Sequence, residues 1–162
     1  TLSGVLVAET SEIWFVQGAG GFGGERSLPP EPQSQIPDRD PDLAISLPTS
    51  LAQAAIYRLS GDRNPLHIDP EAAASVGFDR PILHGLGTMG IVGRALVHAA
   101  CGGVASALRE MNVRFTAPVY PGDTINTHIW QDGDTLYFRA YRNGYEQCII
   151  DNGFAKITLP GA

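Results

Sequence analysis

Lysine is nearly absent from this sequence. Lys156 is the one lysine among eleven basic residues, and seventeen acidic residues bring the net charge to -6. Proteins that bind nucleic acid usually carry a basic excess, so the charge argues against that class. It does not exclude a small anionic ligand, because local patches decide such binding. Arginine suits phosphate recognition, although a GC-rich genome would give the same bias.

Cysteine is scarce as well. The only two are Cys101 and Cys148, and no CxxC pair is present. This usage argues against a disulfide framework and against a cysteine zinc site, and it is typical of a reducing compartment. Both cysteines stand among apolar neighbours, so we expect small buried hydrophobic side chains.

Long apolar runs are missing too. No segment approaches the roughly 18 residues that a membrane span needs, and Thr1 to Glu9 lacks the basic start and apolar core of a signal peptide. The chain ends in PGA rather than in a peroxisomal targeting tripeptide. We therefore expect no membrane association and a cytoplasmic location, most simply in a bacterium.

The first part of the chain does not read as a domain. Residues 1–24 contain β-branched and aromatic residues that predict one or two strands, followed by a glycine-rich tail. Residues 25–48 carry six prolines without periodicity, which indicates an extended linker. Because one or two strands are not stable alone, we expect them to pair with upstream material or with another chain.

Helical signals begin after this linker. A helix is predicted from about Ser50 to Leu59, with Thr49 or Ser50 as its N-cap. A second, short helix has Asp69 as its cap and Pro70 in its first position, and ends at Gly77. A third runs from His84 to Gly103 and is apolar nearly all round, which predicts burial. Its glycines at 87, 90 and 93 each cost about 1 kcal/mol relative to alanine, so close backbone packing is expected there.

From Val104 the apolar period changes to two, which predicts antiparallel strands. Asn143-Gly144 and Asp132-Gly133-Asp134 are hairpin turn signals, and Asp151-Asn152-Gly153 predicts a bulge in the last strand. Residues 49–162 therefore read as an α+β domain in which an antiparallel sheet curls around one buried helix.

The densest cluster of polar chemistry is the loop "YRLSGDRNPLHIDP", Tyr57 to Pro70. Pro65 restricts itself and Asn64 to extended or turn geometry. If the loop folds back, Asp62 and His67 can flank one water as acid and base near neutral pH, and Asn64 can orient that water or one of the two side chains.

A glycine, Gly85, opens the third helix shortly after this loop. The first turn of a helix has free N–H groups and a positive dipole end. Gly85 N–H could therefore donate to a carbonyl oxygen that becomes anionic.

Other interpretations stay open at this point. The Asp-x-Asn-Pro loop is also typical of a simple capped turn. A metal site formed by Asp62, His67, Asp69 and His84 is a further alternative, but no helical histidine pair or cysteine cluster supports it, so we expect no metal. His84 is as readily a buried residue that supports the reacting groups.

The motif "YRLSGDRNPLHIDPEAAASVGFDRPILHGLGTMG" resembles the signature of the MaoC-like, type 2 (R)-specific enoyl-CoA hydratases, and "VRFTAPVYPGDT" (Val113 to Thr124) resembles the segment that follows it in that family. The resemblance covers about Ser50 to Leu159. It implies the hot-dog fold, here with two strands of a preceding hot-dog half. On this basis residues 1–24 are the end of a degenerate first half, 25–48 a linker, and 49–162 a catalytic hot-dog domain.

The resemblance also implies a reaction. Asp62 and His67 match the pair that activates water for addition to a trans-2-enoyl-CoA, Asn64 the supporting amide, and Gly85 the backbone donor to the thioester oxygen. The implied product is a (3R)-3-hydroxyacyl-CoA. No cofactor is needed, because coenzyme A is part of the substrate.

Substrate and partners are less defined. Candidate substrate-binding residues are His84, Leu86, Arg80, Arg94 and Arg114, and the three arginines are candidates for holding the coenzyme A phosphates. The expected partners are an acyl-CoA thioester and the missing first half, in a homodimer or hetero-oligomer. Two alternatives remain: a dehydratase of carrier-protein-bound acyl chains, and a non-catalytic subunit that binds acyl-CoA.

Overall fold

A computed structural model describes residues 4–13, 16, 18–23, 36–144 and 147–158. The chain divides into two compact units, Thr1–Pro32 and Gln33–Ala162. The described residues of the first unit form no helix or strand, so the strands expected there are not formed in the described part. Val5, Leu6 and Val7 are exposed, as expected for strand residues that lack a neighbouring strand. Their assignment to a first hot-dog half stays a prediction.

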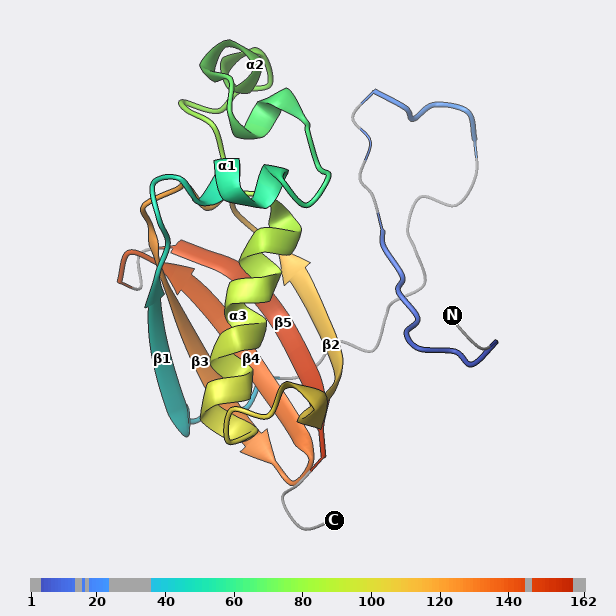
Figure 1. Cartoon of the computed structure of the whole chain (residues 1–162), viewed down its shortest axis with the longest axis vertical. Coiled ribbons are helices and arrows are strands. Elements are labelled where there is room, and N and C mark those ends of the chain that lie inside the picture. Colours follow the sequence, from blue (N-terminus) through green and yellow to red (C-terminus); the bar gives the residue numbers. More distant parts are fainter. Residues whose placement is uncertain (1–3, 14–15, 17, 24–35, 145–146, 159–162) are drawn as a thin grey trace. The chain divides into compact units, whose positions relative to one another are not determined.

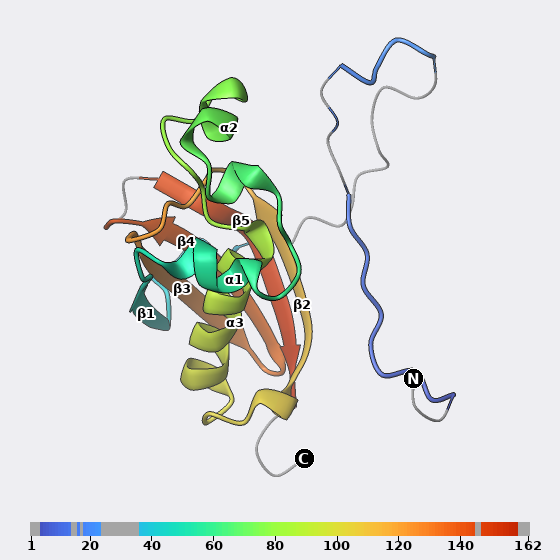
Figure 2. The same cartoon turned by 45° about the horizontal axis from the view of Figure 1, so that its top comes forward.

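The second unit is an α+β fold in which a long helix lies across one face of a five-stranded antiparallel sheet (Figure 1). The strand order is β1-β3-β4-β5-β2. α1 and α2 lie beyond the N-terminal end of α3 in Figure 1, and α2 lies clear of α3 in the turned view of Figure 2 as well. The elements are β1 (Leu43–Pro48), α1 (Gln53–Arg58), α2 (Pro70–Ser75), α3 (Gly85–Ala100), β2 (Leu108–Phe115), β3 (Thr124–Asp132), β4 (Thr135–Arg142) and β5 (Gln147–Ile157). The predicted hot-dog arrangement is confirmed.

The predicted linker is wrong at its C-terminal end. Residues 43–48 form the edge strand β1, which pairs with β3 from Leu43 opposite Ile129 to Pro48 opposite Thr124. Its side chains alternate between half-buried and exposed, a period of two that the surrounding prolines obscured. Pro48 is tolerated because it ends an edge strand, where its missing N–H disturbs little of the ladder.

The short helices begin close to their predicted positions. Asp69 caps α2, because its side chain accepts hydrogen bonds from Glu71 N–H and Ala72 N–H. The first helix starts later than predicted: its N-cap is Ala52, without a side-chain cap. Ser50 accepts instead from Ala52 N–H at 3.1 Å and forms the turn before the helix.

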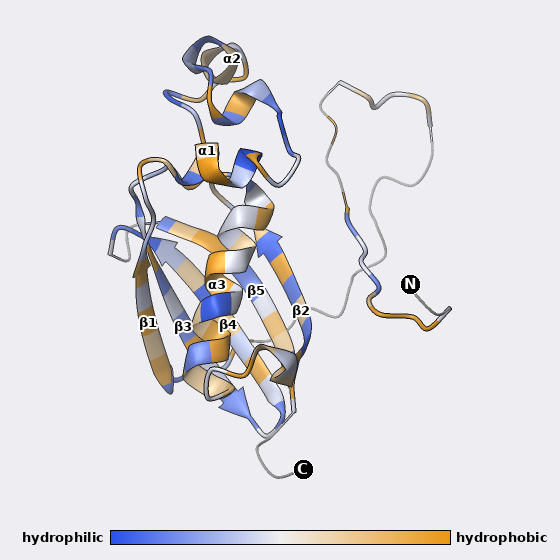
Figure 3. Ribbon diagram, in the orientation of Figure 1, coloured by the Kyte–Doolittle hydropathy of each residue, from blue (hydrophilic) through white to orange (hydrophobic). Residues whose placement is uncertain are grey.

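One face of α3 forms the core with the sheet. Val92, Ala95 and Leu96 are fully buried, and they meet the inward residues of strands whose hydropathy alternates along their length (Figure 3). The prediction of all-round burial is wrong for a stripe spaced four residues apart: Leu86, Gly90, Arg94 and His98 are exposed. Of the two cysteines, Cys101 is buried as predicted and Cys148 is half-buried.

Two of the three glycines at positions 87, 90 and 93 of α3 pack closely against other parts of the fold. A Cβ at Gly87 would lie 3.3 Å from the Tyr57 ring, and one at Gly93 would lie 3.4 Å from Met111 Sδ. Gly90 has open space. Close packing is therefore confirmed at Gly87 and Gly93. A side chain larger than hydrogen would disturb this packing.

The predicted bulge in β5 is also confirmed. Asn112 pairs with Phe154 but Arg114 pairs with Asp151, so β5 carries one extra residue. Asn152 has a positive φ of 52°, and a Cβ on Gly153 would overlap the Phe138 ring. Glycine therefore lets the bent strand pack directly on a core aromatic residue.

Among the described residues, no helix combines the length and the apolar character that crossing a bilayer would require.

Candidate active site

The loop before α2 is built by two successive side-chain caps. Asp62 Oδ1 accepts a hydrogen bond from Asn64 N–H at 3.1 Å, and Asn64 Oδ1 accepts from Leu66 N–H at 3.1 Å. The second cap starts a single 3-10 turn, Pro65–His67. The capped-turn interpretation is therefore correct, and the same turn carries His67 to its position.

His67 is held by the backbone of the segment before α3. Its Nδ1 lies 2.8 Å from the carbonyl oxygen of Ile82. Since a carbonyl can only accept, Nδ1 must carry the proton, and Nε2 of the neutral ring is left with a free lone pair. The next residue is also fixed, because Leu83 N–H donates to Val119 O at 2.7 Å. His67 Nε2 is thereby prepared to act as a base.

His84 lies in the interior beneath His67. It is 2% exposed, its ring stacks on His67 with centroids 3.7 Å apart, and its other neighbour is Tyr57 at 4.5 Å. Nε2 lies 3.4 Å from the backbone oxygen of Asp62, so this nitrogen carries the proton, and Nδ1 has no hydrogen-bond partner among the described residues. The structure thus gives His84 a supporting position rather than a surface that a substrate can touch.

Burial lowers the pKa of His84 below its ordinary value, and the adjacent His67 lowers it further. The nearby Asp62 backbone oxygen and carboxylate act in the opposite direction, while Arg58 adds to the lowering. A neutral His84 leaves His67 as the ring that can exchange protons with a ligand.

Asp62, His67 and His84 converge as the sequence predicts for the first two. Each offers a ligand-type atom, and these atoms all lie within 4.8 Å of one another. The Asp62 side chain is half exposed, with Oδ2 4.0 Å from His84 Nε2. A carboxylate and an imidazole at this separation can share one water or one small substrate group.

The same three residues are also donors that a metal ion could use, because each offers one nitrogen or oxygen atom. That no metal binds here stays a prediction.

Gly85 is the first residue of α3, with His84 as its N-cap. Its N–H belongs to the first turn, which has no partner inside the helix, and the residue is exposed. A Cβ here would rest 3.5 Å from the Phe115 ring, which bounds one side of the helix start. The N–H is therefore available to an oxygen atom of a ligand, and the preceding residue, His84, contacts both Asp62 and His67.

The remaining predicted residues separate into two groups. Leu86 is exposed on the first turn of α3, and Arg80 lies over the Tyr120 ring. Arg94 is exposed nine residues into α3, about 14 Å along the axis from Gly85. Arg114 pairs across strands with Asp151. Arg80 thus lines the cavities near the loop, whereas Arg94 and Arg114 line neither of them.

Sequence reasoning missed the residues that hold the loop in place. Asp123 is 4% exposed and accepts hydrogen bonds from Tyr120 N–H at 2.9 Å and from Asn143 Nδ2 at 2.8 Å. It fixes the turn that follows Val119, whose carbonyl holds Leu83. The motif from Val113 to Thr124 contains this aspartate, but only the fold reveals what it supports.

An open cavity of about 270 Å³ adjoins His67. Besides His67 and Arg80, it is lined by the apolar side chains of Leu51, Ala54, Ala55, Ile68, Pro81 and Pro121. A hydrocarbon or amide chain can lie along these apolar side chains.

Comparison with known proteins finds related sequences and structures. The chain is 54% identical over 130 residues to 3-hydroxyacyl-thioester dehydratase Y of Mycobacterium tuberculosis, covering 80% of this chain and 44% of that protein. It is 46% identical over 158 residues to a probable enoyl-CoA hydratase 2 of Dictyostelium discoideum, covering 96% and 53%. The crystal structure of a MaoC-like dehydratase from Phytophthora capsici superposes with a TM-score of 0.80 at 44% identity, covering 89% of this chain and 51% of that one.

The chain spans about half the length of these relatives, from 44% to 53%. Residues 32–147 match the family described as the MaoC like domain, and they include the capped loop, the start of α3 and four of the five strands. The protein of this sequence belongs to the MaoC-like domain family.

Proposed function

We propose that this protein catalyses the reversible (R)-specific hydration of a trans-2-enoyl-CoA to a (3R)-3-hydroxyacyl-CoA. The observation that carries the proposal is the proximity of the Asp62 carboxylate and the His67 imidazole, beside His84, the residue that precedes the free N–H of Gly85 at the start of α3. The names of the relatives, an enoyl-CoA hydratase 2 and a 3-hydroxyacyl-thioester dehydratase, describe the two directions of such a reaction. Their names support a hydro-lyase.

Gly85 N–H binds the thioester oxygen. This makes C3 of the enoyl group electrophilic and stabilises the enolate-like transition state as charge develops on that oxygen. The partial positive charge at the start of α3 acts in the same direction.

Asp62 and His67 hold one water between them. One member of the pair removes a proton from the water as its oxygen bonds to C3, and a proton passes from the pair to C2. Hydrogen and hydroxyl therefore add to the same face, and every atom added comes from water. Asn64 keeps the loop in the turn that places both side chains, and the step requires no metal or redox cofactor.

The alternatives have less support. A non-catalytic binding subunit has no use for the complete set of acid, base and oxyanion donor. Dehydration of an acyl chain on a carrier protein uses the same chemistry and differs only in what lies beyond the thioester.

The test is hydration of crotonyl-CoA and longer trans-2-enoyl-CoA thioesters by the full-length protein, followed by loss of the enoyl-thioester absorbance. We expect turnover with at least one chain length and a product of R configuration. Failure with every chain length would defeat the proposal.

We also propose that the second unit works beside a first hot-dog half or another copy, in the cytoplasm. The support is the exposed stripe on α3 and the exposed apolar residues of the first unit. Native mass spectrometry should show an assembly, and a stable 17.2 kDa monomer of this chain would contradict the expectation.

A further inference from the structure

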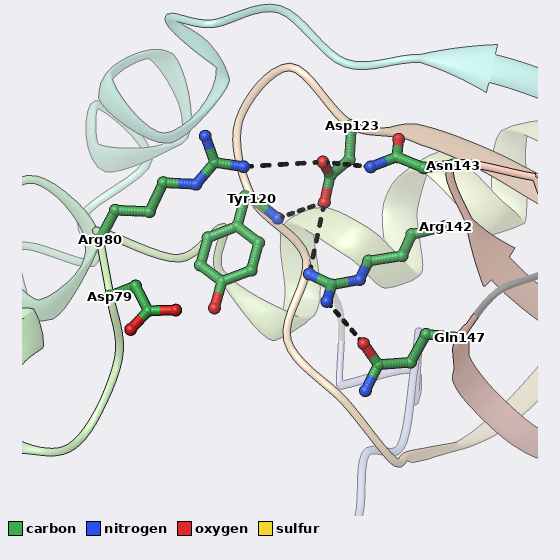
Figure 4. Close-up of a pocket in the computed structure, with 7 residues that line it drawn as sticks. All are labelled: Asp79, Arg80, Tyr120, Asp123, Arg142, Asn143 and Gln147. Atoms are coloured by element: carbon green, nitrogen blue, oxygen red, sulfur yellow. Dashed lines mark hydrogen bonds and ion pairs between the residues drawn. The ribbon is translucent and has the colours of Figure 1, made fainter.

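Arg80 lines two cavities of the second unit. The smaller one, of about 270 Å³, touches His67, and the larger one, of about 670 Å³, is a polar chamber of a size typical of ligand sites. The larger cavity is lined by Asp79, Arg80, Tyr120, Asp123, Arg142, Asn143 and Gln147 (Figure 4). Because one side chain borders both, a ligand that extends from His67 past Arg80 would enter this chamber.

Two guanidinium groups from different elements face this chamber over one aromatic ring. Arg80 comes from the loop before α3, with Cζ 4.6 Å from the Tyr120 ring centroid. Arg142 comes from the end of β4, with Cζ 5.0 Å from the same centroid. Packing on an aromatic ring fixes the plane of a guanidinium without using its N–H donors.

Asp123 sets the distance between the two guanidinium groups. Its oxygens lie 3.9 Å from Arg80 and 3.8 Å from Arg142, and its side chain is 5% exposed. Both oxygens already accept hydrogen bonds, from Tyr120 N–H and Asn143 Nδ2. Asp123 offsets one of the two guanidinium charges and Asp79, which also lines the cavity, offsets the other. Recognition of a ligand therefore depends on the directed N–H donors of the guanidinium groups rather than on a net positive charge.

The guanidinium of Arg80 is the freer of the two. Its side chain is 59% exposed, and it donates no hydrogen bond to the described part of the chain; its ion-pair distance to Asp123 is beyond hydrogen-bond range. Arg142 already donates to Gln147 Oε1 and more weakly to Pro118 O. Asp79 is the opposing charge, at the side of the chamber where Figure 4 shows the Tyr120 hydroxyl.

Resting on the proposed function, we infer that Arg80 and Arg142 bind a phosphate of the group that carries the thioester, while its flexible amide arm crosses the smaller cavity to His67. Guanidinium groups match phosphate oxygens in a planar, charge-assisted fork. This assigns the phosphate role to Arg80, together with Arg142, and not to Arg94 or Arg114, which line neither cavity. The phosphate comes either from the nucleotide of coenzyme A or from the phosphopantetheine of a carrier protein.

Calorimetric titration of the full-length protein with two probes that lack a thioester tests the site without any turnover. The probes are adenosine 3′,5′-bisphosphate and 4′-phosphopantetheine. We expect Arg80→Gln and Arg142→Gln each to raise the Kd by about tenfold, the scale of one lost charged hydrogen bond. Asp79→Asn should lower it. The matched control is Arg94→Gln, which removes the same charge from α3 and should leave the Kd unchanged.

The two probes separate the sources of phosphate. Much tighter binding of the bisphosphate identifies coenzyme A, and equal binding of both identifies a site for the single phosphate that carrier proteins also present. The inference is overturned if wild type binds neither probe, or if Arg80→Gln binds both as wild type does. Arg80 is exposed, so this variant remains decisive if Arg142→Gln does not fold.

Kinetics distinguish failure of this inference from failure of the proposed function. Crotonyl-CoA carries the phosphates, and the crotonyl thioester of N-acetylcysteamine lacks them. Arg80→Gln should lower kcat/KM for crotonyl-CoA about tenfold, through a higher KM. It should leave kcat/KM for the N-acetylcysteamine thioester unchanged. An equal fall with both thioesters means that Arg80 only supports the loop. If wild type converts neither, the proposed reaction is wrong, and the titrations alone decide the phosphate site.

Discussion

The imidazole rings of His67 and His84 stack with centroids 3.7 Å apart, and a backbone carbonyl fixes a proton on one nitrogen of each. His67 Nδ1 donates to Ile82 O, and His67 is half-buried whereas His84 is buried. Two stacked rings this close do not both carry a charge readily, because each cation raises the energy of the other. The lowered pKa of His84 favours its neutral form, and the proposed function gives the proton transfer to His67.

The proposed acid–base roles predict large losses from isosteric changes. Asp62→Asn and His67→Gln should each lower kcat by about 10²–10⁴-fold, with thermal stability little changed. Steady-state hydration of the enoyl thioester measures this. Activity within a factor of a few of wild type would refute the assignment of that residue.

The role of the Gly85 N–H as an oxyanion donor can be separated from the effect of adding a side chain at this position. Gly85→Pro removes the N–H at the first position of α3, where proline is tolerated, and His84 already has the extended φ of -57° and ψ of 139° that precede proline. We expect kcat to fall about 10²–10³-fold, as for loss of one oxyanion donor.

Gly85→Ala is the matched control for that variant. Its Cβ would make an ordinary 3.5 Å contact with Phe115, and its N–H remains, so it should keep most of its activity. Equal losses in the alanine and proline variants would show that shape, not the N–H, matters at this position.

Burial of His84 predicts acid sensitivity. Its pKa is lowered in the folded state, so the unfolded chain binds a proton more readily. The stabilising effect is complete above the unfolded pKa of about 6.5 and is lost as the pH falls toward the lower folded value. His84→Phe should therefore reduce the dependence of unfolding free energy on pH between about 7 and 5.

Urea unfolding at several pH values measures this slope. Some dependence should remain, since burial also lowers the pKa of His128. An unchanged slope in His84→Phe would contradict a neutral, buried His84.

The glycines predict opposite effects of the same substitution. Gly153→Ala would place a Cβ on the Phe138 ring and should destabilise the fold by about 1–3 kcal/mol. Gly90→Ala meets open space within α3 and should stabilise it by about 0.5–1 kcal/mol through helix propensity. Denaturant midpoints compare the two, and destabilisation by Gly90→Ala would indicate that this face of α3 is covered in the assembly.

The sequence predicted what depends on local chemistry. Asp69 and Pro70 predicted the start of α2, and the Asp-Asn-Gly run predicted the bulge in β5. The loop around Asp62 and His67 predicted a candidate active site. The sequence did not predict the features that depend on tertiary contacts. The prolines hid the alternation of β1, and nothing near His67 in the sequence indicated that Ile82 O would hold its ring.

The arginines show the same limit. Arg80, Arg94 and Arg114 were equivalent candidates as residues, since each is a guanidinium in a segment of the same domain. Their distinction is spatial: Arg80 alone shares its chamber with Arg142 and Tyr120. Because Arg142 is 62 positions further along the chain, only strand pairing and the turn at Asp123 could identify it as a partner.

The most direct measurement of the central claim is the stereochemistry of hydration in heavy water. The full-length protein is incubated with crotonyl-CoA in D₂O, and the product is analysed by NMR and chiral chromatography. Water held between Asp62 and His67 predicts R configuration at C3 and one deuterium at C2, added to the same face as the hydroxyl. An S centre at C3, or deuterium on the opposite face, would contradict the account.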